Sequence, residues 1–267
     1  MKLRIFALML AMLPVLAAAK VVVPEKKMVS QERICPREFT EIDISSAITL
    51  ILENGPECKV RVEAYENVLP VVETVISRGT ILIRIKSGIT FRNNPNIKVF
   101  VTMPTLTRLA SSGACDIRTT GTMESDLPLS IRLSGAVNLN GSYKAAAINI
   151  TASGASDCKP SLVCDGAARI AASGASNIKG SIECGDLSLE ATGASDIELK
   201  GTCGALDVKC SGASDLKCYE LVSASIRGRV SGASDGQFFT TGTEDISTSG
   251  AGSANIKKPD GSVIKKR

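Results

Sequence analysis

The sequence has 267 residues, with 31 Lys and Arg, 27 Asp and Glu and no His, which gives a formal net charge of +4. This near balance predicts no strong attraction to nucleic acid or to anionic membranes. The absence of His excludes His-based catalytic triads and the commonest zinc ligand. Trp is also absent and aromatic residues make up 3 % of the chain, which argues against the aromatic platforms on which many enzymes bind sugar rings.

Residues 1–19 have the composition of a secretory signal peptide. Lys2 and Arg4 precede an apolar stretch, residues 5–16, that is too short to span a bilayer comfortably, and three alanines at 17–19 form a small-residue cleavage site. We therefore expect an exported protein, in the periplasm or on the outer cell surface, with no transmembrane segment in the mature chain. Cleavage would remove two of the 31 basic residues and none of the 27 acidic ones, leaving a net charge of +2.

The next part of the chain is expected to form strands without a regular repeat. We assign residues 20–32 to an N-terminal linker and residues 33–104 to irregular first turns that cover one end of the fold, where strand edges would otherwise be unpaired. Only residues 66–75 could form a short helix, and Pro70 opposes it. The strand-like segments of this region are 39–44, 48–52, 59–64, 81–85 and 97–103.

Eight near-copies of one phrase follow, with Ser-Gly-Ala-Ser-Asp as its commonest form. Their glycines are spaced 22, 19, 20, 19, 19, 20 and 18 residues apart, which is typical of a solenoid in which each turn returns the same residue types to the same place. Gly at a tight corner tolerates a positive φ and leaves room for the adjacent turn. The eight glycines are Gly113, Gly135, Gly154, Gly174, Gly193, Gly212, Gly232 and Gly250.

The spacing leaves room for about three short strands per turn but hardly for a helix. Alternating segments such as 148–152, 187–191 and 206–210 indicate half-buried strands, and two further apolar positions recur in most turns. Three inward-facing sides predict an all-β, right-handed parallel β-helix with 19–20 residues per turn. We expect one domain over residues 33–257, with regular repeats from 105 and a basic tail, 258–267, that blunts the last turn.

Stacking places like residues in ladders along the axis, about 4.8 Å apart. One ladder has hydroxyl side chains and another has acidic or amide side chains. Their members are Ser112, Ser134, Ser153, Ser173, Thr192, Ser211, Ser231 and Ser249 in the first, and Asp116, Asn138, Asp157, Asn177, Asp196, Asp215 and Asp235 in the second.

Nine cysteines in an exported chain raise the question of disulfides. Cys164, Cys184 and Cys203 fall in one apolar column of the repeat, and we interpret them as buried thiols because free Cys packs as a small hydrophobic residue. Stacked parallel positions also hold the Cβ atoms farther apart than the roughly 3.8 Å that a disulfide prefers. Cys35 and Cys58 flank the first strands and could pair or stay free. The odd total leaves at least one thiol free or bonded to another chain.

A family resemblance rests on five motifs. They are Phe39-x-x-Ile42-x-Ile44, Val60-x-Val62-x-Ala64, residues 79–85, Val99-x-Val101-x-Met103-Pro104 and the repeated phrase. From residue 33 to 257 this pattern resembles the bacterial family described as putative auto-transporter adhesin, head GIN domain. The resemblance implies an exported β-helical envelope protein, common in the Bacteroidetes, with no established enzymatic activity.

The acidic ladder offers two interpretations. Stacked carboxylates about 5 Å apart repel by roughly 1 kcal/mol in water, so the repulsion must be offset. The first interpretation has each side chain accept backbone N–H groups at its turn, which also explains why Asn can replace Asp. The second places Ca²⁺ between neighbouring carboxylates, although no calcium-roll repeat is present.

The leading functional hypothesis is a non-enzymatic, exported cell-envelope protein, an adhesin-like or surface-interaction module that binds an envelope or extracellular ligand, either a glycan or a protein. We expect no catalytic residues, no cofactor, no metal site and no nucleic-acid partner. The alternative is a carbohydrate-active β-helix enzyme, a lyase or hydrolase. Arg169, Arg227 and Arg229 are the most conspicuous departures from the repeat, but no carboxylate is clearly out of pattern beside them.

Overall fold

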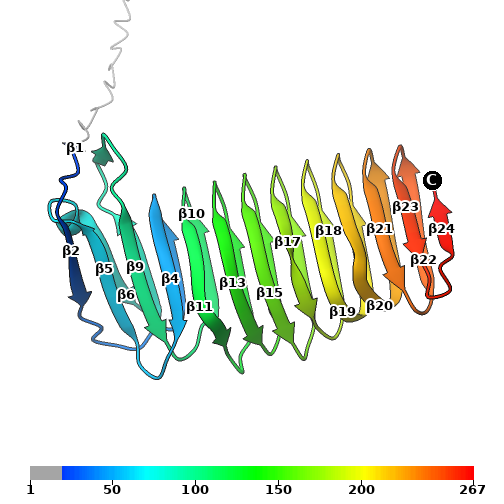
Figure 1. The fold of residues 1–267 in the computed structure, drawn as a ribbon, viewed down its shortest axis with the longest axis horizontal. Coiled ribbons are helices and arrows are strands. Elements are labelled where there is room, and N and C mark those ends of the chain that lie inside the picture. The colour runs from blue at the N-terminus through cyan, green and yellow to red at the C-terminus, as the bar shows by residue number, and fades with distance from the viewer. Residues whose placement is uncertain (1–19) are drawn as a thin grey trace, which may run out of the picture.

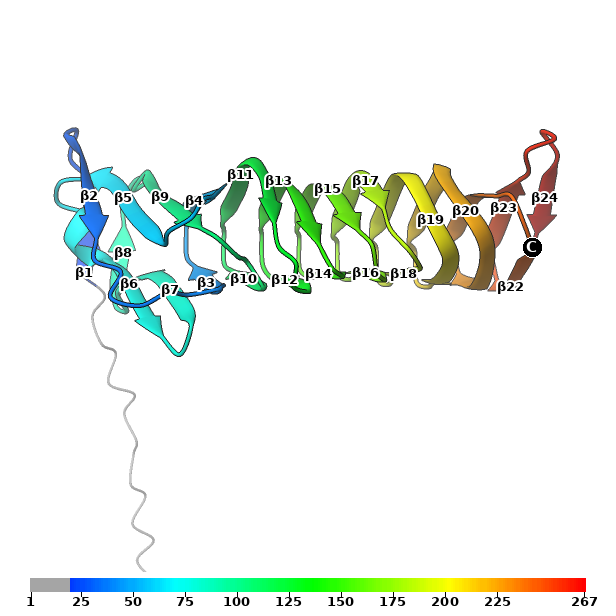
Figure 2. The same ribbon diagram turned by 90° about the horizontal axis from the view of Figure 1, so that it is seen from below.

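The computed structural model describes residues 20–267. It shows an elongated rod of stacked β-helical coils, with its N-terminal end at the left of Figure 1 and its C-terminal end at the right. The expected signal peptide, residues 1–19, lies outside the described residues. In the regular turns, the strands that face the viewer of Figure 1 run downwards, and the views in Figures 1 and 2 agree that the chain advances as a right-handed coil. The predicted right-handed parallel β-helix is therefore confirmed.

Each regular turn places one strand segment on the back face of the rod and a longer one on the front face. On the back face are β10 (Arg108–Ser112), β12 (Leu129–Leu133), β14 (Ile148–Ala152), β16 (Ala168–Ala172), β18 (Leu187–Ala191) and β22 (Glu244–Gly250). On the front face are β11 (Asp116–Glu124), β13 (Asn138–Ala145), β15 (Asp157–Cys164), β17 (Asn177–Glu183), β21 (Asp235–Thr240) and β23 (Ser253–Lys257). Two long strands, β19 (Asp196–Cys210) and β20 (Asp215–Gly232), bend around a corner and contribute to both faces.

The core is a set of apolar columns that runs the length of the rod. Ile150 pairs with Ile170, and Ile170 pairs with Leu189, so one back-face column repeats every 19 or 20 residues. All three side chains are fully buried. Each turn alone exposes its apolar face, so stacking the turns is what stabilises them.

The N-terminal region caps the rod with strands that do not follow chain order. Its elements are β1 (Lys20–Val22), β2 (Met28–Arg33), β3 (Glu41–Ser45), β4 (Ile48–Asn54), β5 (Lys59–Tyr65), the 3₁₀ helix η1 (Leu69–Val71), β6 (Val72–Ser77), β7 (Thr80–Ile85), β8 (Ile89–Phe91) and β9 (Ile97–Met103). The turn β3–β4 pairs with β10 and β11 on one side and with β7 and β9 on the other. The later segment β7–β9 is therefore the outer turn, and the chain must run outwards before it returns to β10.

Antiparallel strands complete this cap. β5 runs antiparallel to both β9 and β2, and β6 forms a hairpin with β7. The segment expected as a linker, residues 20–32, contains β1, which pairs with β8, and most of β2. Of the segment considered for a helix, only three residues form η1, with Pro70 inside it, and residues 72–77 form β6.

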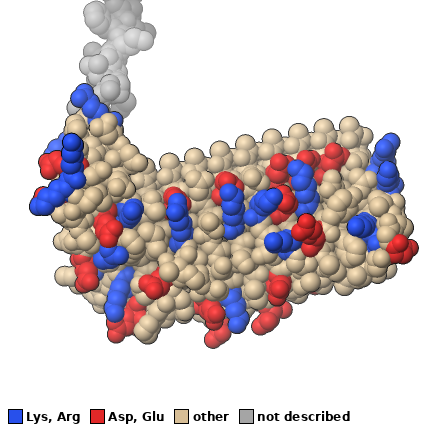
Figure 3. Space-filling model, viewed as in Figure 1, with Lys and Arg blue, Asp and Glu red and all other residues tan. Residues whose placement is uncertain are grey.

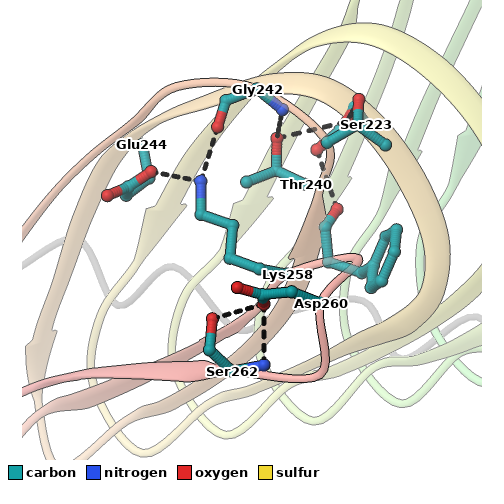
Figure 4. Close-up of polar contacts among 9 residues, drawn as sticks. Ser223, Thr240, Gly242, Glu244, Lys258, Asp260 and Ser262 are labelled. Atoms are coloured by element: carbon teal, nitrogen blue, oxygen red, sulfur yellow. Dashed lines mark hydrogen bonds and ion pairs between the residues drawn. The ribbon is translucent and has the colours of Figure 1, made fainter.

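The C-terminal end closes with an antiparallel strand. The basic tail forms β24 (Val263–Lys266), which pairs with β23. Lys258 reaches back to the preceding turn, where its ammonium group contacts the carboxylate of Glu244 and donates to the carbonyl of Gly242 (Figure 4). The adjacent Asp260 accepts hydrogen bonds from the N–H and hydroxyl of Ser262 and so stabilises the turn into β24.

Candidate binding groove

The repeated phrase forms one corner of every turn. Its eight glycines have φ values between 74 and 93°, in the left-handed region that favours glycine. Space is also short at this corner, because a Cβ on Gly174 would lie 2.7 Å from the carbonyl oxygen of Gly154 in the turn before. That carbonyl accepts a 2.8 Å hydrogen bond from the N–H of Ala175. The glycines are therefore required by the stacking itself.

The two serines of the phrase have different structural roles. The first serine connects turns, since the hydroxyl of Ser153 donates to the carbonyl of Leu133, 3.1 Å away in the preceding turn. The second serine is buried and closes its own corner, since the hydroxyl of Ser156 donates to the carbonyl of Ser153 at 2.9 Å. Sequence reasoning singled out the first ladder and missed the second. Its equivalents Ser176, Ser195, Ser214 and Ser234 are buried as well.

Basic residues on the same strands pair with three carboxylates of the acidic ladder. Arg118 pairs with Asp116 at 2.7 Å, and Lys217 lies 3.6 Å from Asp215. These pairs join residues two apart on one strand, whose side chains project to the same face. For the ladder carboxylates of residues 20–267, the recorded partners are basic or hydroxyl side chains, and no turn N–H is among them. The first interpretation is therefore wrong about the partner: a cation two residues along the strand pairs with Asp116, Asp157 and Asp215, and Asp235 accepts from the hydroxyl of Ser253.

Neither a group of potential metal ligands nor a membrane-spanning helix occurs in the part of the chain that the structure describes. In residues 20–267, no three or more His, Cys, Asp or Glu side chains are grouped so that they could hold a metal ion. Within the same range, no helix is long and apolar enough to cross a membrane.

A groove of about 690 Å³ lies across the front face, over strands β13 to β21. The floor of the groove is formed by residues with small or compact side chains at equivalent positions in successive turns: Gly141, Pro160 and Gly180. A Cβ on Gly180 would lie 2.1 Å from the carbonyl oxygen of Pro160, so the floor is largely backbone at this point. The walls are formed by charged and polar side chains from successive turns: Asn140, Lys159, Ser161, Lys179, Ser181, Glu198, Lys200, Lys217, Tyr219, Glu220 and Gln237.

An irregularity in β20 forms one wall of the groove. Between β19 and β20 the register shifts by one residue after Glu198, and between β20 and β21 it shifts again between Cys218 and Val222. Extra residues in one strand of a pair redirect its side chains outward. Tyr219 and Glu220 lie in this segment and are exposed at the groove. The altered turn in β20 thus lies at the groove, and a second register shift occurs in β11, between Arg118 and Thr122.

The groove carries both signs of charge, and three of its four lysines form ion pairs with carboxylates in or beside it. Four lysines and two glutamates line it, and Lys179 pairs with Glu198 at 2.7 Å. Lys200 is exposed and is the register partner of Glu220. Figure 3 shows basic side chains in a row across this face, with acidic side chains among them. This arrangement suits a ligand that presents acidic groups at intervals along an extended chain.

The arginines that the sequence marked as departures do not line the groove. Arg227 on the back face pairs with Asp207 of the adjacent turn at 2.9 Å, and Arg229 donates to the hydroxyl of Ser249 at 3.1 Å. Arg169 pairs with Glu190. Their role is to pair turns, and a cross-strand partner explains each of them.

All nine cysteines are free thiols in the structure, and most are buried. Burial raises the pKa of Cys158 and of Cys218 to about 12, so both stay protonated at neutral pH. Of the three cysteines expected to be buried in one column, Cys164 and Cys203 are buried and Cys184 is only partly buried. The register places Ser223 after Cys203, and Val222 is exposed, because the shift in β20 inserts one residue.

The fold is a right-handed parallel β-helix with a charged, open groove on one face. The sequence profile of the family described as putative auto-transporter adhesin, head GIN domain, matches residues 38–163 and 160–258. The chain belongs to that family. A comparison with curated proteins gives no significant match.

Solved structures show the same fold at low sequence identity. A putative adhesin from Bacteroides fragilis is 18 % identical, with a TM-score of 0.68 over 89 % of this chain and 99 % of the other. A putative adhesin from Parabacteroides distasonis is 17 % identical, with a TM-score of 0.67 over 90 % and 93 %. A protein from the same species described as a putative lipid binding protein is 18 % identical, with a TM-score of 0.64 over 90 % and 99 %.

Proposed function

We propose that this protein is an exported, non-enzymatic component of the cell envelope that binds an extended acidic glycan along the front-face groove. The observation that carries the proposal is the altered turn in β20. It places Tyr219 and Glu220 beside a row of lysines, whereas the residues of the repeated phrase are occupied by contacts within the fold. The family description suggests an adhesin-like role and an exported or surface location, and both support this proposal.

The geometry of the groove favours a chain-like ligand over a compact one. Stacked turns are about 4.8 Å apart, so Lys159 and Lys179 present their ammonium groups at successive steps along the rod axis. Acidic groups on consecutive units of a polymer can contact several of these lysines at once, which raises the affinity above that of a single contact. Tyr219 offers an aromatic face at one end of the row.

A second candidate function, a polysaccharide lyase or hydrolase, is favoured by one observation. Glu198 and Glu220 both line the groove, and paired carboxylates are the usual groups for cleaving glycosidic bonds. However, Glu198 forms an ion pair with Lys179, and the groove is open to solvent.

Binding and turnover separate the two candidates. Residues 20–267 would be screened on a glycan array and incubated with a panel of acidic polysaccharides, with new chain ends measured by a reducing-end assay and by absorbance of unsaturated products. The proposal predicts binding to acidic glycans, weakened by salt, and no new chain ends. Turnover that is lost in Glu198→Gln or Glu220→Gln would overturn it in favour of the enzyme.

Export is tested in cells. Envelope fractionation of the producing bacterium, with protease treatment of whole cells, would distinguish a periplasmic protein from one on the outer surface. The proposal predicts an envelope fraction and an N-terminus at Lys20 after cleavage. An intact N-terminus at Met1 in the cytoplasmic fraction would contradict it.

A further inference from the structure

Two cysteines of the N-terminal cap occupy facing positions. In the antiparallel pair β2–β5, Arg33 is the register partner of Val60. The paired register ends there, and Cys35 and Cys58 are each the second residue beyond this last pair on their own side of the ladder. Directly opposite residues in an antiparallel pair project to the same face. Both side chains are partly buried and pack against the core.

The distance between such positions suits a disulfide. Directly opposite Cβ atoms lie roughly 4.5–5.5 Å apart, and disulfides span Cβ separations of roughly 3.5–4.5 Å. A small closing movement is therefore sufficient, and Cys35 has the freedom for it because it follows the last paired residue of β2. The two thiols now donate only to carbonyl oxygens, Cys35 to Arg33 at 3.6 Å and Cys58 to Phe39 at 3.5 Å.

The pKa of Cys35 supports the proximity of the two sulfurs. Burial raises the pKa of the Cys35 thiol, and the charge of a Cys58 thiolate raises it further. Burial raises the pKa of Cys184, and the nearby Cys203 and Cys164 raise it further, but these three cysteines stack in a parallel ladder. Cys158 and Cys218 are fully buried in parallel ladders, where stacked positions suit a disulfide poorly.

We propose that Cys35 and Cys58 form a disulfide when the exported chain meets a disulfide oxidant. The Cys35 thiolate attacks the oxidant to form a mixed disulfide and releases one oxidant thiolate. The Cys58 thiolate then displaces the second one, so two protons and two electrons leave the protein and the disulfide of the oxidant is reduced to two thiol groups. The oxidant class is a protein disulfide or oxidised glutathione. The proposal rests on the export proposed above for its oxidising compartment.

The bond would fasten the cap to the first turns of the rod. The loop between the two cysteines contains β3 and β4, which pair with β10 and β11 of the regular stack. β2 is the outermost strand of the front face and pairs only with β5 among the described strands. A covalent link at its end keeps this edge strand in place and so hides the β5 edge from other chains.

Peptide mapping tests the pair without any substitution. The full chain would be equilibrated with oxidised glutathione, alkylated in denaturant and digested with trypsin. Cleavage after Arg33, Arg37 and Lys59 leaves Cys35 in peptide 34–37 and Cys58 in peptide 38–59. The expected result is one cross-linked product of these two peptides, with the seven other cysteines alkylated. Alkylation of both Cys35 and Cys58, or a link from either to another cysteine, would overturn the proposal.

A second test measures the melting temperatures of cysteine variants, and a peptide map of protein isolated from cells tests the proposed export separately from the proposed disulfide. A reducing agent should lower the melting temperature of the oxidised wild type and leave the Cys35→Ser/Cys58→Ser variant unchanged, while Cys184→Ser should respond as the wild type does. Equal shifts in all three would contradict the proposal. The same peptide map on protein isolated from the envelope tests export separately: a linked pair after glutathione but free thiols in cells would count against export, not against the pair.

Discussion

Replacing Gly174 with alanine should destabilise the rod far more than the addition of one methyl group suggests. Gly174 has φ = 74°, and an L-residue there costs about 1–2 kcal/mol. Its new Cβ would also lie 2.7 Å from the carbonyl oxygen of Gly154, which is backbone and cannot rotate away. Forcing an extra carbon into packed structure costs about 1–3 kcal/mol. We therefore expect a loss of about 2–5 kcal/mol in the free energy of unfolding, the sum of these two terms.

Gly79 provides the matched control. Its φ of 79° is almost the same, but no atom lies within 4 Å of the position that a Cβ would occupy. Gly79→Ala should therefore cost only the conformational part, about 1–2 kcal/mol. Urea unfolding followed by circular dichroism would measure both variants. Equal losses for Gly174→Ala and Gly79→Ala would refute the argument that the corner glycines are required by contact between turns.

Four further predictions concern the corner, the ends and the core. Ser176→Ala should lower the free energy of unfolding by about 1 kcal/mol, because it removes the buried 2.8 Å hydrogen bond to the Ser173 carbonyl; an unchanged urea midpoint would contradict this. The pKa of Glu244 is lowered, first by its hydrogen bond to Lys258, so the stability that this pair provides is present above the unfolded pKa and is lost as the pH falls through the folded value. The difference in melting temperature between wild type and Lys258→Met should accordingly shrink from pH 7 to pH 3, and a constant difference would be evidence against the pair. Cys218, with its pKa raised to about 12 by burial, should resist alkylation at pH 8 until the protein unfolds; rapid labelling of the native chain would contradict its burial. A chelator should leave the melting temperature unchanged, whereas a clear decrease would support Ca²⁺ in the acidic ladder.

The repeated phrase is why the sequence predicted the fold. The near-constant spacing of the corner glycines indicates turns of similar length, from which the apolar columns follow, and the right hand follows from the usual hand of parallel crossovers. The cap carries no such marker. Nothing in the sequence of residues 41–54 or 80–103 shows that the earlier segment stacks between the regular turns and the later segment. Strand partners depend on contacts between distant parts of the chain.

The groove was only partly visible in the sequence. Tyr219 and Glu220 are ordinary surface residues in the sequence, and they become wall residues because the register of β20 shifts on both of its sides. Counting residues between successive phrases shows 20 rather than 19 in that turn, which is too small a signal to locate a groove. Likewise, Glu198 occupies a position where Lys159, Lys179 and Lys217 stand in other turns, and this exchange was available to sequence reasoning but overlooked.

The central claim is that the front-face groove, and not the repeated phrase, binds the ligand. The most direct test compares Lys159→Gln/Lys200→Gln in the groove with Arg132→Gln/Lys209→Gln, which removes the same charge from exposed positions on the back face. Binding of each variant to acidic polysaccharides immobilised on a sensor would be measured at fixed salt. The account predicts at least a tenfold loss for the groove variant, corresponding to about 1.4 kcal/mol, and no more than a small change for the back-face variant. Equal losses in both variants, or none in the groove variant, would contradict it.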